Sequence, residues 1–192
     1  MVDVMRRRGR GRAAERHQPL GAVAARYASM GWPVCAGAHP ISPAWQMQAT
    51  VDLNVIQSWW EARPEANVIL VTGRVFDVLD VPVAAGSAAL GQMAATGAAA
   101  GPVAVLGADR MLFFVMTRGS PADEDEWWSC GLDCEPESVV TGLRWHCRDS
   151  YVLAPPSRYA DGLAARWLRP PRDHPLPDAL RLLEYLVDAC EA

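Results

Sequence analysis

The sequence of 192 residues predicts an α+β domain with a mixed, largely antiparallel sheet flanked by helices. Three observations lead to this prediction. Half of the residues (51%) are apolar, so the chain can bury a sizeable core. Stretches with helical periodicity and short apolar runs follow one another in the order α, α, β, β, α, β, β, β, β, α. No internal repeat interrupts this order.

Local signals place four helices. Asp52 is a good N-cap for one of them, and Pro64 terminates it. Gly31 ends the helix before it. The alanine and glycine content of the third helix indicates packing through small residues. The fourth is amphipathic and presents Leu180 and Leu186 on one side. The four predicted helices cover residues 19–30, 52–63, 83–100 and 177–190.

Short apolar runs bounded by glycine and proline predict strands. The six runs cover residues 67–71, 75–81, 103–106, 111–116, 151–154 and 165–168. Residues 35–50 are expected to form a loop and residues 130–150 to be irregular. No Gly-x-Gly-x-x-Gly, Walker or Gly-x-Ser-x-Gly pattern occurs, which excludes phosphate loops and nucleophile elbows of those kinds.

Charge is distributed unevenly along the chain. Residues 1–18 hold six arginines against Asp3 and Glu15, a net charge of +4, and are poor in apolar residues. They are expected to be a disordered arm, which either solubilises the protein or contacts nucleic acid. Residues 19–192 hold 12 arginines against 20 acids, a net charge of −8, so a strongly basic duplex-DNA binder is not expected.

Cysteine usage and hydropathy indicate a cytoplasmic protein with no membrane partner. The chain has five cysteines, no signal peptide and no run of 18 apolar residues. The thiols are therefore expected to be free. Cys130 and Cys134 with His146 and Cys147 are a candidate zinc site, although their spacing is looser than that of a typical zinc motif.

Two tryptophan pairs allow more than one interpretation. Trp59 falls on the apolar stripe of its helix, so the core is favoured over stacking on a base. The pair 127–128 follows four acidic residues that would repel phosphate, so a partner-binding patch is favoured there.

Six segments stand out along the chain: AARYASMGWPV (24–34), GAHP (37–40), ATVDLNVIQSWWEARPEANVILVTG (49–73), FDVLDV (76–81), GADRMLFFV (107–115) and YVLAPPSR (151–158). In this order they resemble the Prim-Pol domain found at the N-terminus of bifunctional DNA primase/polymerase proteins. The resemblance covers roughly residues 20–170 and implies an archaeo-eukaryotic primase-type core, with an RRM-like sheet that holds the active site. The chain is then a basic arm (1–18) followed by a Prim-Pol-like domain (19–192).

The resemblance also implies two-metal nucleotidyl transfer, which needs three carboxylates around Mg²⁺ or Mn²⁺. The first acid of the family falls on Asp80, but the second falls on Pro82, which cannot bind a metal. The third falls on Arg144, unless Asp149 is shifted into its place. The nucleotide-binding histidine of the family falls on Met111. The metal centre is therefore expected to be largely dismantled, with no cofactor, and with Mg²⁺ or Mn²⁺ at Asp80 only if the protein is active.

A buried Asp80 would need a partner, and Arg74, Arg110 or Arg144 could neutralise it in place of the ion. The old nucleotide groove is expected to persist as a pocket. Its expected lining residues are Thr72, Gly73, Asp80, Arg110, Met111, Arg144, Ser157 and Arg158.

The expected function is that of a catalytically impaired primase/polymerase-like protein. It would bind a nucleotide, single-stranded DNA or a protein partner in a replication-associated or regulatory role. One alternative is an active DNA primase/polymerase that uses Asp80 together with Asp149 or Asp109. The other is a purely structural or partner-binding regulatory domain.

Overall fold

The structure is a computed structural model of the chain. It describes residues 19–37, 48–117, 142–148, 150–159 and 162–192. The predicted arm (1–18), Trp127, Trp128 and Asp149 lie outside these residues.

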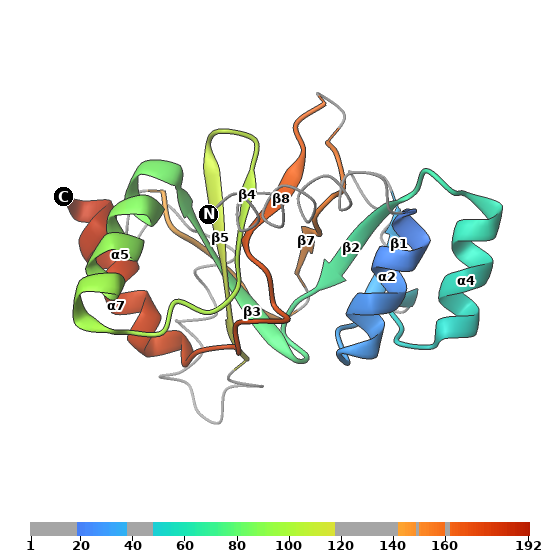
Figure 1. Ribbon diagram of the computed structural model, residues 1–192, viewed down its shortest axis with the longest axis horizontal. Coiled ribbons are helices and arrows are strands. Elements are labelled where there is room, and N and C mark those ends of the chain that lie inside the picture. The colour runs from blue at the N-terminus through green and yellow to red at the C-terminus, as the bar shows by residue number, and fades with distance from the viewer. Residues whose placement is uncertain (1–18, 38–47, 118–141, 149, 160–161) are drawn as a thin grey trace, which may run out of the picture.

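Within the described residues, the fold contains four helices and eight strands, which are arranged as Figure 1 shows. The helices are α2 (Leu20–Ser29), α4 (Leu53–Ala62), α5 (Val83–Thr96) and α7 (Ala179–Glu191). The strands are β1 (Val34–Gly37), β2 (Asn67–Val71), β3 (Phe76–Pro82), β4 (Val103–Leu106), β5 (Arg110–Met116), β6 (Arg144–His146), β7 (Tyr151–Leu153) and β8 (Ala165–Arg169).

The strands form two sheets, in the orders β1-β2-β7 and β6-β3-β5-β4-β8, and every pair of named strands is antiparallel. The predicted α+β class is confirmed. Two expectations about local structure are wrong. Cys35–Gly37 belongs to β1 rather than to a loop, because these residues pair with β2. Arg144–His146 forms β6 rather than irregular chain, because it pairs with β3.

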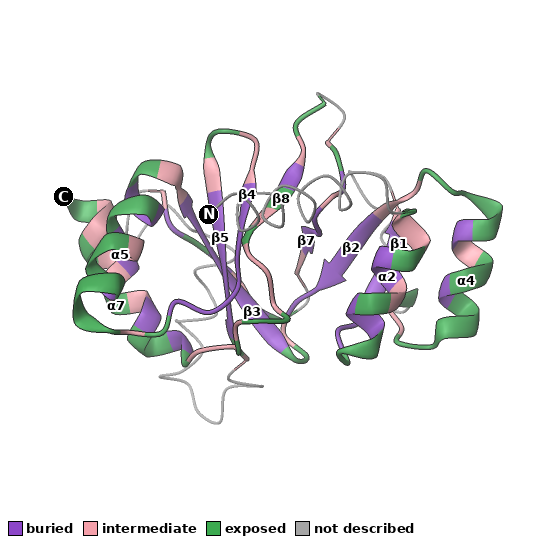
Figure 2. Cartoon of the chain, in the orientation of Figure 1, coloured by how far each residue is buried: buried purple, intermediate pink, exposed green. Residues whose placement is uncertain are grey.

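The five-stranded sheet separates two layers of the molecule (Figure 1). Helices α5 and α7 lie on one side of it, and the three-stranded sheet with α2 and α4 lies on the other. Side chains alternate along a strand, so Leu79 and Val81 of β3 face α5 and α7, whereas Val78 and Asp80 face the three-stranded sheet. Buried residues line both layers (Figure 2).

Aromatic side chains join α2 to the five-stranded sheet. Trp32 packs against Phe76, with ring centroids 4.4 Å apart, and stacks on Phe114 at 5.5 Å. The Tyr27 hydroxyl accepts a hydrogen bond from Trp167 Nε1 at 2.7 Å and lies 2.7 Å from the carbonyl oxygen of Pro155, to which it donates. These bonds connect residues more than 120 positions apart in the sequence.

The helices begin and pack largely as their sequences indicate. Asp52 caps α4, because its side chain accepts a hydrogen bond from Asn54 N at 2.8 Å. In α5, a Cβ on Gly86 would lie 2.7 Å from Met111 Sδ, so the small residue is required for contact with β5. The predicted apolar stripe of α7 is partly wrong: Leu186 is buried, but Leu180 is 42% exposed and Leu182 takes its place in the core.

The cysteines of the described chain are free thiols, as expected. Cys35 and Cys147 are buried, and burial raises the pKa of the Cys35 thiol, so it stays protonated at neutral pH.

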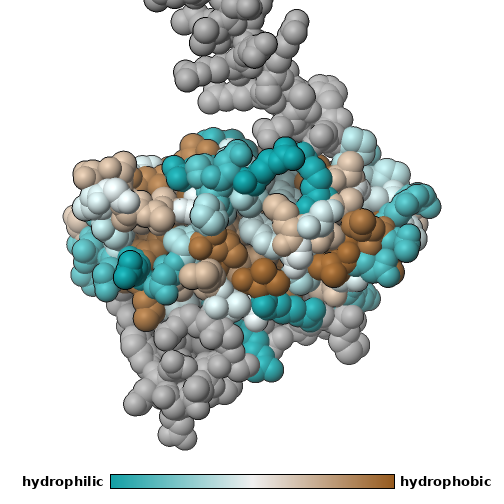
Figure 3. Space-filling model, turned by 60° about the horizontal axis from the view of Figure 1, so that its bottom comes forward, coloured by the Kyte–Doolittle hydropathy of each residue, from teal (hydrophilic) through white to brown (hydrophobic). Residues whose placement is uncertain are grey.

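None of the helices that the structure describes has the length and apolar character needed to cross a membrane. One face of the surface shows apolar patches between hydrophilic ones (Figure 3). Single exposed apolar residues such as Val75 and Met116 are normal for a folded protein and do not by themselves indicate an interface.

Candidate nucleotide site

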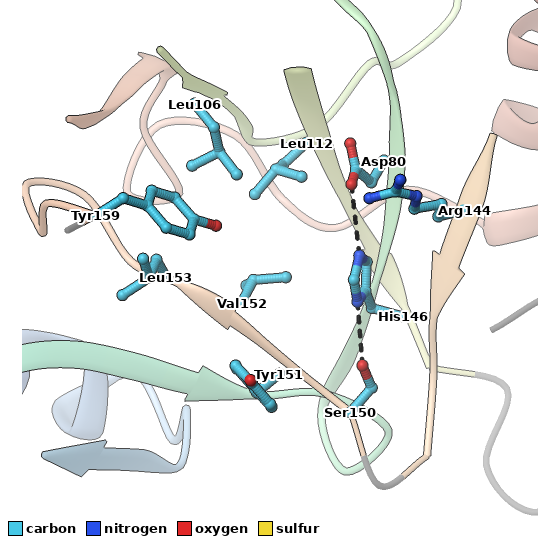
Figure 4. Close-up of a pocket in the computed structure, with 10 residues that line it drawn as sticks. All are labelled: Asp80, Leu106, Leu112, Arg144, His146, Ser150, Tyr151, Val152, Leu153 and Tyr159. Carbon is cyan, nitrogen blue, oxygen red and sulfur yellow. Dashed lines mark hydrogen bonds and ion pairs between the residues drawn. The ribbon is translucent and has the colours of Figure 1, made fainter. Parts of the chain in front are cut away.

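A pocket of about 370 Å³ lies where the two sheets meet (Figure 4). Strands β3, β4, β5 and β6 supply one part of its lining, and β7 with the flanking chain supplies the rest. The lining residues are Asp80, Leu106, Leu112, Arg144, His146, Ser150, Tyr151, Val152, Leu153 and Tyr159. The volume is at the small end of the range of about 300–1,000 Å³ typical of ligand pockets.

Asp80 is held by an ion pair at the pocket wall. Arg110 Nε lies 2.7 Å from Asp80 Oδ1, and the two side chains are 23% and 6% exposed. Arg110 Nη2 also donates to the carbonyl oxygens of Asp80, at 3.0 Å, and of Gly142, at 2.8 Å. One of the three arginines considered as a partner for Asp80 is therefore paired with it. The guanidinium offsets the carboxylate charge that burial would otherwise make costly.

Arg144 lies directly opposite Asp80 in the register between β3 and β6. Directly opposed residues on antiparallel strands share one face of the sheet, so both side chains reach the pocket. Arg144 is exposed, and its guanidinium has no hydrogen-bond or ion-pair partner among the described residues. Among the described residues, the carboxylate of Asp80 is paired with Arg110, and no carboxylate forms an ion pair with Arg144.

His146 connects Asp80 to Ser150 along the same wall (Figure 4). His146 Nε2 lies 3.6 Å from Asp80 Oδ2, and His146 Nδ1 lies 3.0 Å from Ser150 Oγ. The first distance is an electrostatic contact, and the second is a hydrogen bond whose donor depends on the imidazole tautomer. The two contacts fix the ring so that one edge faces the carboxylate and the other the hydroxyl.

The opposite side of the pocket is apolar and aromatic. Leu106 and Leu153 lie there beside the ring of Tyr159, whose hydroxyl points toward the centre of the pocket (Figure 4). Leu112 and Val152 lie between the two sides. The pocket therefore has polar groups at one end, among them the guanidinium of Arg144 and the carboxylate of Asp80, and an apolar, partly aromatic surface at the other.

These residues do not fit a divalent metal ion. Mg²⁺ and Mn²⁺ prefer several carboxylate oxygens, but Asp80 is the only carboxylate among the described lining residues, and one of its oxygens is bound by Arg110. Pro82 at the end of β3 offers no ligand, and Arg144 brings a charge of the wrong sign. Among the residues that the structure describes, no group of three or more His, Cys, Asp or Glu side chains is arranged to hold a metal.

Met111 does not line the pocket, contrary to the expectation from the sequence. Asp80 is opposite Leu112 in the register between β3 and β5, so Arg110 and Leu112 share its face and Met111 points to the other. Met111 is buried against α5 and α7 instead. On the pocket face of β5, the polar side chain nearest to this position is Arg110.

Thr72 and Gly73, also expected in the lining, hold the chain that enters β7. Thr72 Oγ1 donates to the carbonyl oxygen of Cys147, and Thr72 N donates to that of Ser150 at 3.0 Å. Gly73 has φ +78°, and a Cβ there would collide with the backbone of Arg148. Their role is to fix the position of Ser150 rather than to form the pocket wall.

Ser157 and Arg158 lie outside the lining as well. Ser157 Oγ is buried and exchanges hydrogen bonds with the backbone of Val68, accepting from N at 2.8 Å and donating to O at 3.2 Å. The backbone N of Arg158 donates to Asn67 Oδ1 at 3.0 Å, and its side chain is exposed. Both residues attach the segment after β7 to β2.

Of the eight residues expected to line the pocket, only Asp80 and Arg144 do so, with Arg110 behind Asp80. His146 was considered only as a zinc ligand, and Ser150 and Tyr159 were missed. The alternation of polar Arg144, buried Trp145 and polar His146 was the signal for a strand with two side chains on one face. Cys130, Cys134 and Asp149 lie outside the described residues.

Comparison with known proteins agrees with this architecture. The family model described as "Bifunctional DNA primase/polymerase, N-terminal" (Prim-Pol) matches residues 24–179. A search of the curated proteins found no match. The matched range covers most of the chain and includes both sheets and the whole pocket, so the protein belongs to the Prim-Pol family of bifunctional DNA primase/polymerase N-terminal domains.

Proposed function

We propose that this chain is a Prim-Pol protein with impaired catalysis, which binds a nucleotide through Arg144 rather than through metal ions. One observation carries the proposal: Asp80 is paired with Arg110 while Arg144 stands opposite it on β6. The wall that would need three negative groups to hold two cations carries a net positive charge.

Loss of polymerisation follows from this charge. Two-metal catalysis places cations on the attacking and leaving oxygens of the reacting phosphate. A single carboxylate already bound to a guanidinium competes poorly for Mg²⁺, which gives up its water ligands reluctantly. The guanidinium of Arg144 would also repel a cation brought to Asp80.

Retention of binding follows from the same residues. A guanidinium can form two parallel hydrogen bonds to a phosphate group, and charge-assisted bonds of this kind are among the strongest in proteins. No described residue forms a hydrogen bond or ion pair with the Arg144 guanidinium, so a phosphate group does not have to displace any of them. His146 and Ser150 add further hydrogen-bonding groups on the same wall.

The test combines a binding measurement with an activity measurement on the full chain. Calorimetric titration with deoxynucleoside mono- and triphosphates in EDTA should give saturable binding. Extension of a labelled primer on a template with Mn²⁺ should give no product. Template-dependent extension would overturn the impaired-catalysis part of the proposal and indicate that a further carboxylate completes a metal centre.

Two matched variants locate the binding. Arg144→Gln removes the charge in the pocket, whereas Arg158→Gln removes an exposed arginine outside the lining. We expect the first to weaken binding by about tenfold or more and the second to change it by less than about twofold. Absence of nucleotide binding in the parent protein, or equal effects of the two variants, would contradict the proposed site and favour a role in protein binding.

A further inference from the structure

The charges around the pocket also indicate how many phosphate groups it accepts. Arg110 donates hydrogen bonds from Nε to the Asp80 carboxylate and from Nη2 to the carbonyl oxygens of Asp80 and Gly142. Its positive charge is therefore paired with Asp80 behind the pocket wall. Among the described lining residues, Arg144 is the arginine, and no described residue forms a hydrogen bond or ion pair with its guanidinium. A single phosphate group matches it in charge and in the geometry of its hydrogen bonds.

Further phosphate groups would meet an unfavourable environment. Asp80 Oδ2 lies on the pocket side of the carboxylate, 3.6 Å from His146 Nε2. Arg110 binds Oδ1 of this carboxylate from behind the wall, so a phosphate chain that extends past Arg144 meets Oδ2, an acceptor oxygen that cannot donate a hydrogen bond to it. In two-metal enzymes the cations neutralise the phosphate chain, but the donor set here does not fit them.

The apolar end of the pocket defines the rest of the ligand. The ring of Tyr159 lies with Leu106 and Leu153 on the side away from Arg144, and together they form the apolar and aromatic end of the pocket (Figure 4). Aromatic rings stack on nucleobases regardless of the base, because every base has a π face. A volume of about 370 Å³ suits a small ligand with a planar group at one end and an anionic group at the other.

Resting on the proposed function, we propose that the pocket selects a nucleoside monophosphate over the corresponding triphosphate. Arg144, with His146 and Ser150 beside it, receives the phosphate group. Tyr159 and the two leucines receive the base. This preference is the reverse of that expected of a polymerase, whose substrate is the triphosphate.

The experiment compares dAMP, dATP and deoxyadenosine in calorimetric titrations of the full chain, all in EDTA. We expect dAMP to bind about tenfold more tightly than either of the others, because dATP adds uncompensated charge and deoxyadenosine lacks the phosphate. Tighter binding of dATP than of dAMP would overturn this inference and leave the proposed nucleotide site standing. Absence of binding by all three ligands would overturn both.

Variants separate the two ends of the pocket. Arg144→Gln should make dAMP bind as weakly as deoxyadenosine, and Tyr159→Leu should weaken dAMP without changing the affinity for inorganic phosphate. Arg166→Gln, an exposed arginine on β8 outside the lining, is the matched control and should leave all affinities within about twofold. A preference for dAMP that survives Arg144→Gln, in a variant with a native circular dichroism spectrum, would contradict the inference.

Discussion

The two faces of the five-stranded sheet differ in the polarity of the side chains that they carry at the level of the pocket. The face toward α5 and α7 is buried and mainly apolar, with Leu79, Val81 and Phe113 among its residues. Its buried carboxylate, Asp77, accepts a hydrogen bond from Trp145 Nε1 at 3.3 Å. The face toward the three-stranded sheet begins in the same way at Phe76 but changes to a charged pair at Asp80 and Arg110. Both faces contribute buried apolar residues to the core, and the second also carries the candidate site.

This difference shows how a site can change its chemistry while its fold stays in place. Because neighbouring residues of a strand point to opposite faces, replacing the pocket residues of β3 and β6 leaves the apolar face unaltered. Arg144 stands where the resemblance implies a metal-binding acid, yet the strand around it still pairs with β3. Pairing between β3 and β6 is therefore compatible with an arginine at this position.

The strongest expected contrast concerns the apolar face. Phe113→Ala removes a fully buried ring between the sheet and its helices, so we expect the free energy of unfolding to fall by about 3–5 kcal/mol. Urea denaturation followed by circular dichroism measures this. Leu180→Ala, at a 42% exposed position of α7, is the control and should cost no more than about 0.5 kcal/mol. Similar losses in the two variants would mean that this face does not hold the fold together.

A smaller effect is expected at the charged pair. Arg110→Met leaves the buried carboxylate of Asp80 without its partner, which should cost about 1–3 kcal/mol once the partial exposure of Arg110 is allowed for. Adding Asp80→Asn removes the uncompensated charge, so the double variant should be more stable than Arg110→Met alone. A double variant that is less stable than both single variants would show that the two residues contribute independently.

The smallest effect separates backbone conformation from close packing beside the pocket. Gly31 and Gly73 have nearly the same φ, +80° and +78°, but only Gly73 lies against the backbone of Arg148. Gly31→Ala should lower the free energy of unfolding by about 1 kcal/mol, because alanine disfavours a positive φ. Gly73→Ala should lower it by about 1–2 kcal/mol more than Gly31→Ala does, because the added Cβ also collides with the backbone. Gly73→Ala should also weaken nucleotide binding, because the displaced turn carries Ser150. Equal melting temperatures for the two variants would show that the chain at Gly73 and Arg148 can move apart without loss of stability.

The sequence predicted the elements that have strong local signals. Apolar runs of four to seven residues located most strands, and Asp52 and Gly31 marked helix ends. It failed at β6, where three residues give too short a run for alternation to be recognised, and at Cys35–Gly37, which becomes a strand only through pairing with β2. Both segments are strands because they pair with distant parts of the chain, and their own sequences do not show a strand preference.

The candidate site was predictable only in part, again because strand pairing decides where residues lie. The resemblance identified Asp80 and Arg144 because it compares positions along the chain. It placed Met111 in the pocket because position alone does not say which face of a strand a residue occupies. The register opposite Asp80 decides that, and it is a property of the assembled sheet. The pocket forms only after β6 has joined the five-stranded sheet and β7 the three-stranded sheet. Only then do three lining residues lie around one space: His146, Ser150 and Tyr159.

The order of strands in the two sheets also has a consequence for biosynthesis. Strand β7 pairs with β2, and β6 pairs with β3, so strands from the last third of the chain complete sheets begun in the first half. Pairing between segments so distant in sequence is slow, because a large loop must close before any bond forms. A nascent chain on the ribosome can bury much of β3 and β5 early, but it has no pocket until Tyr159 has been synthesised. We therefore expect ligand binding to report on completion of the domain, and a translation arrest before residue 159 to release a chain that cannot bind.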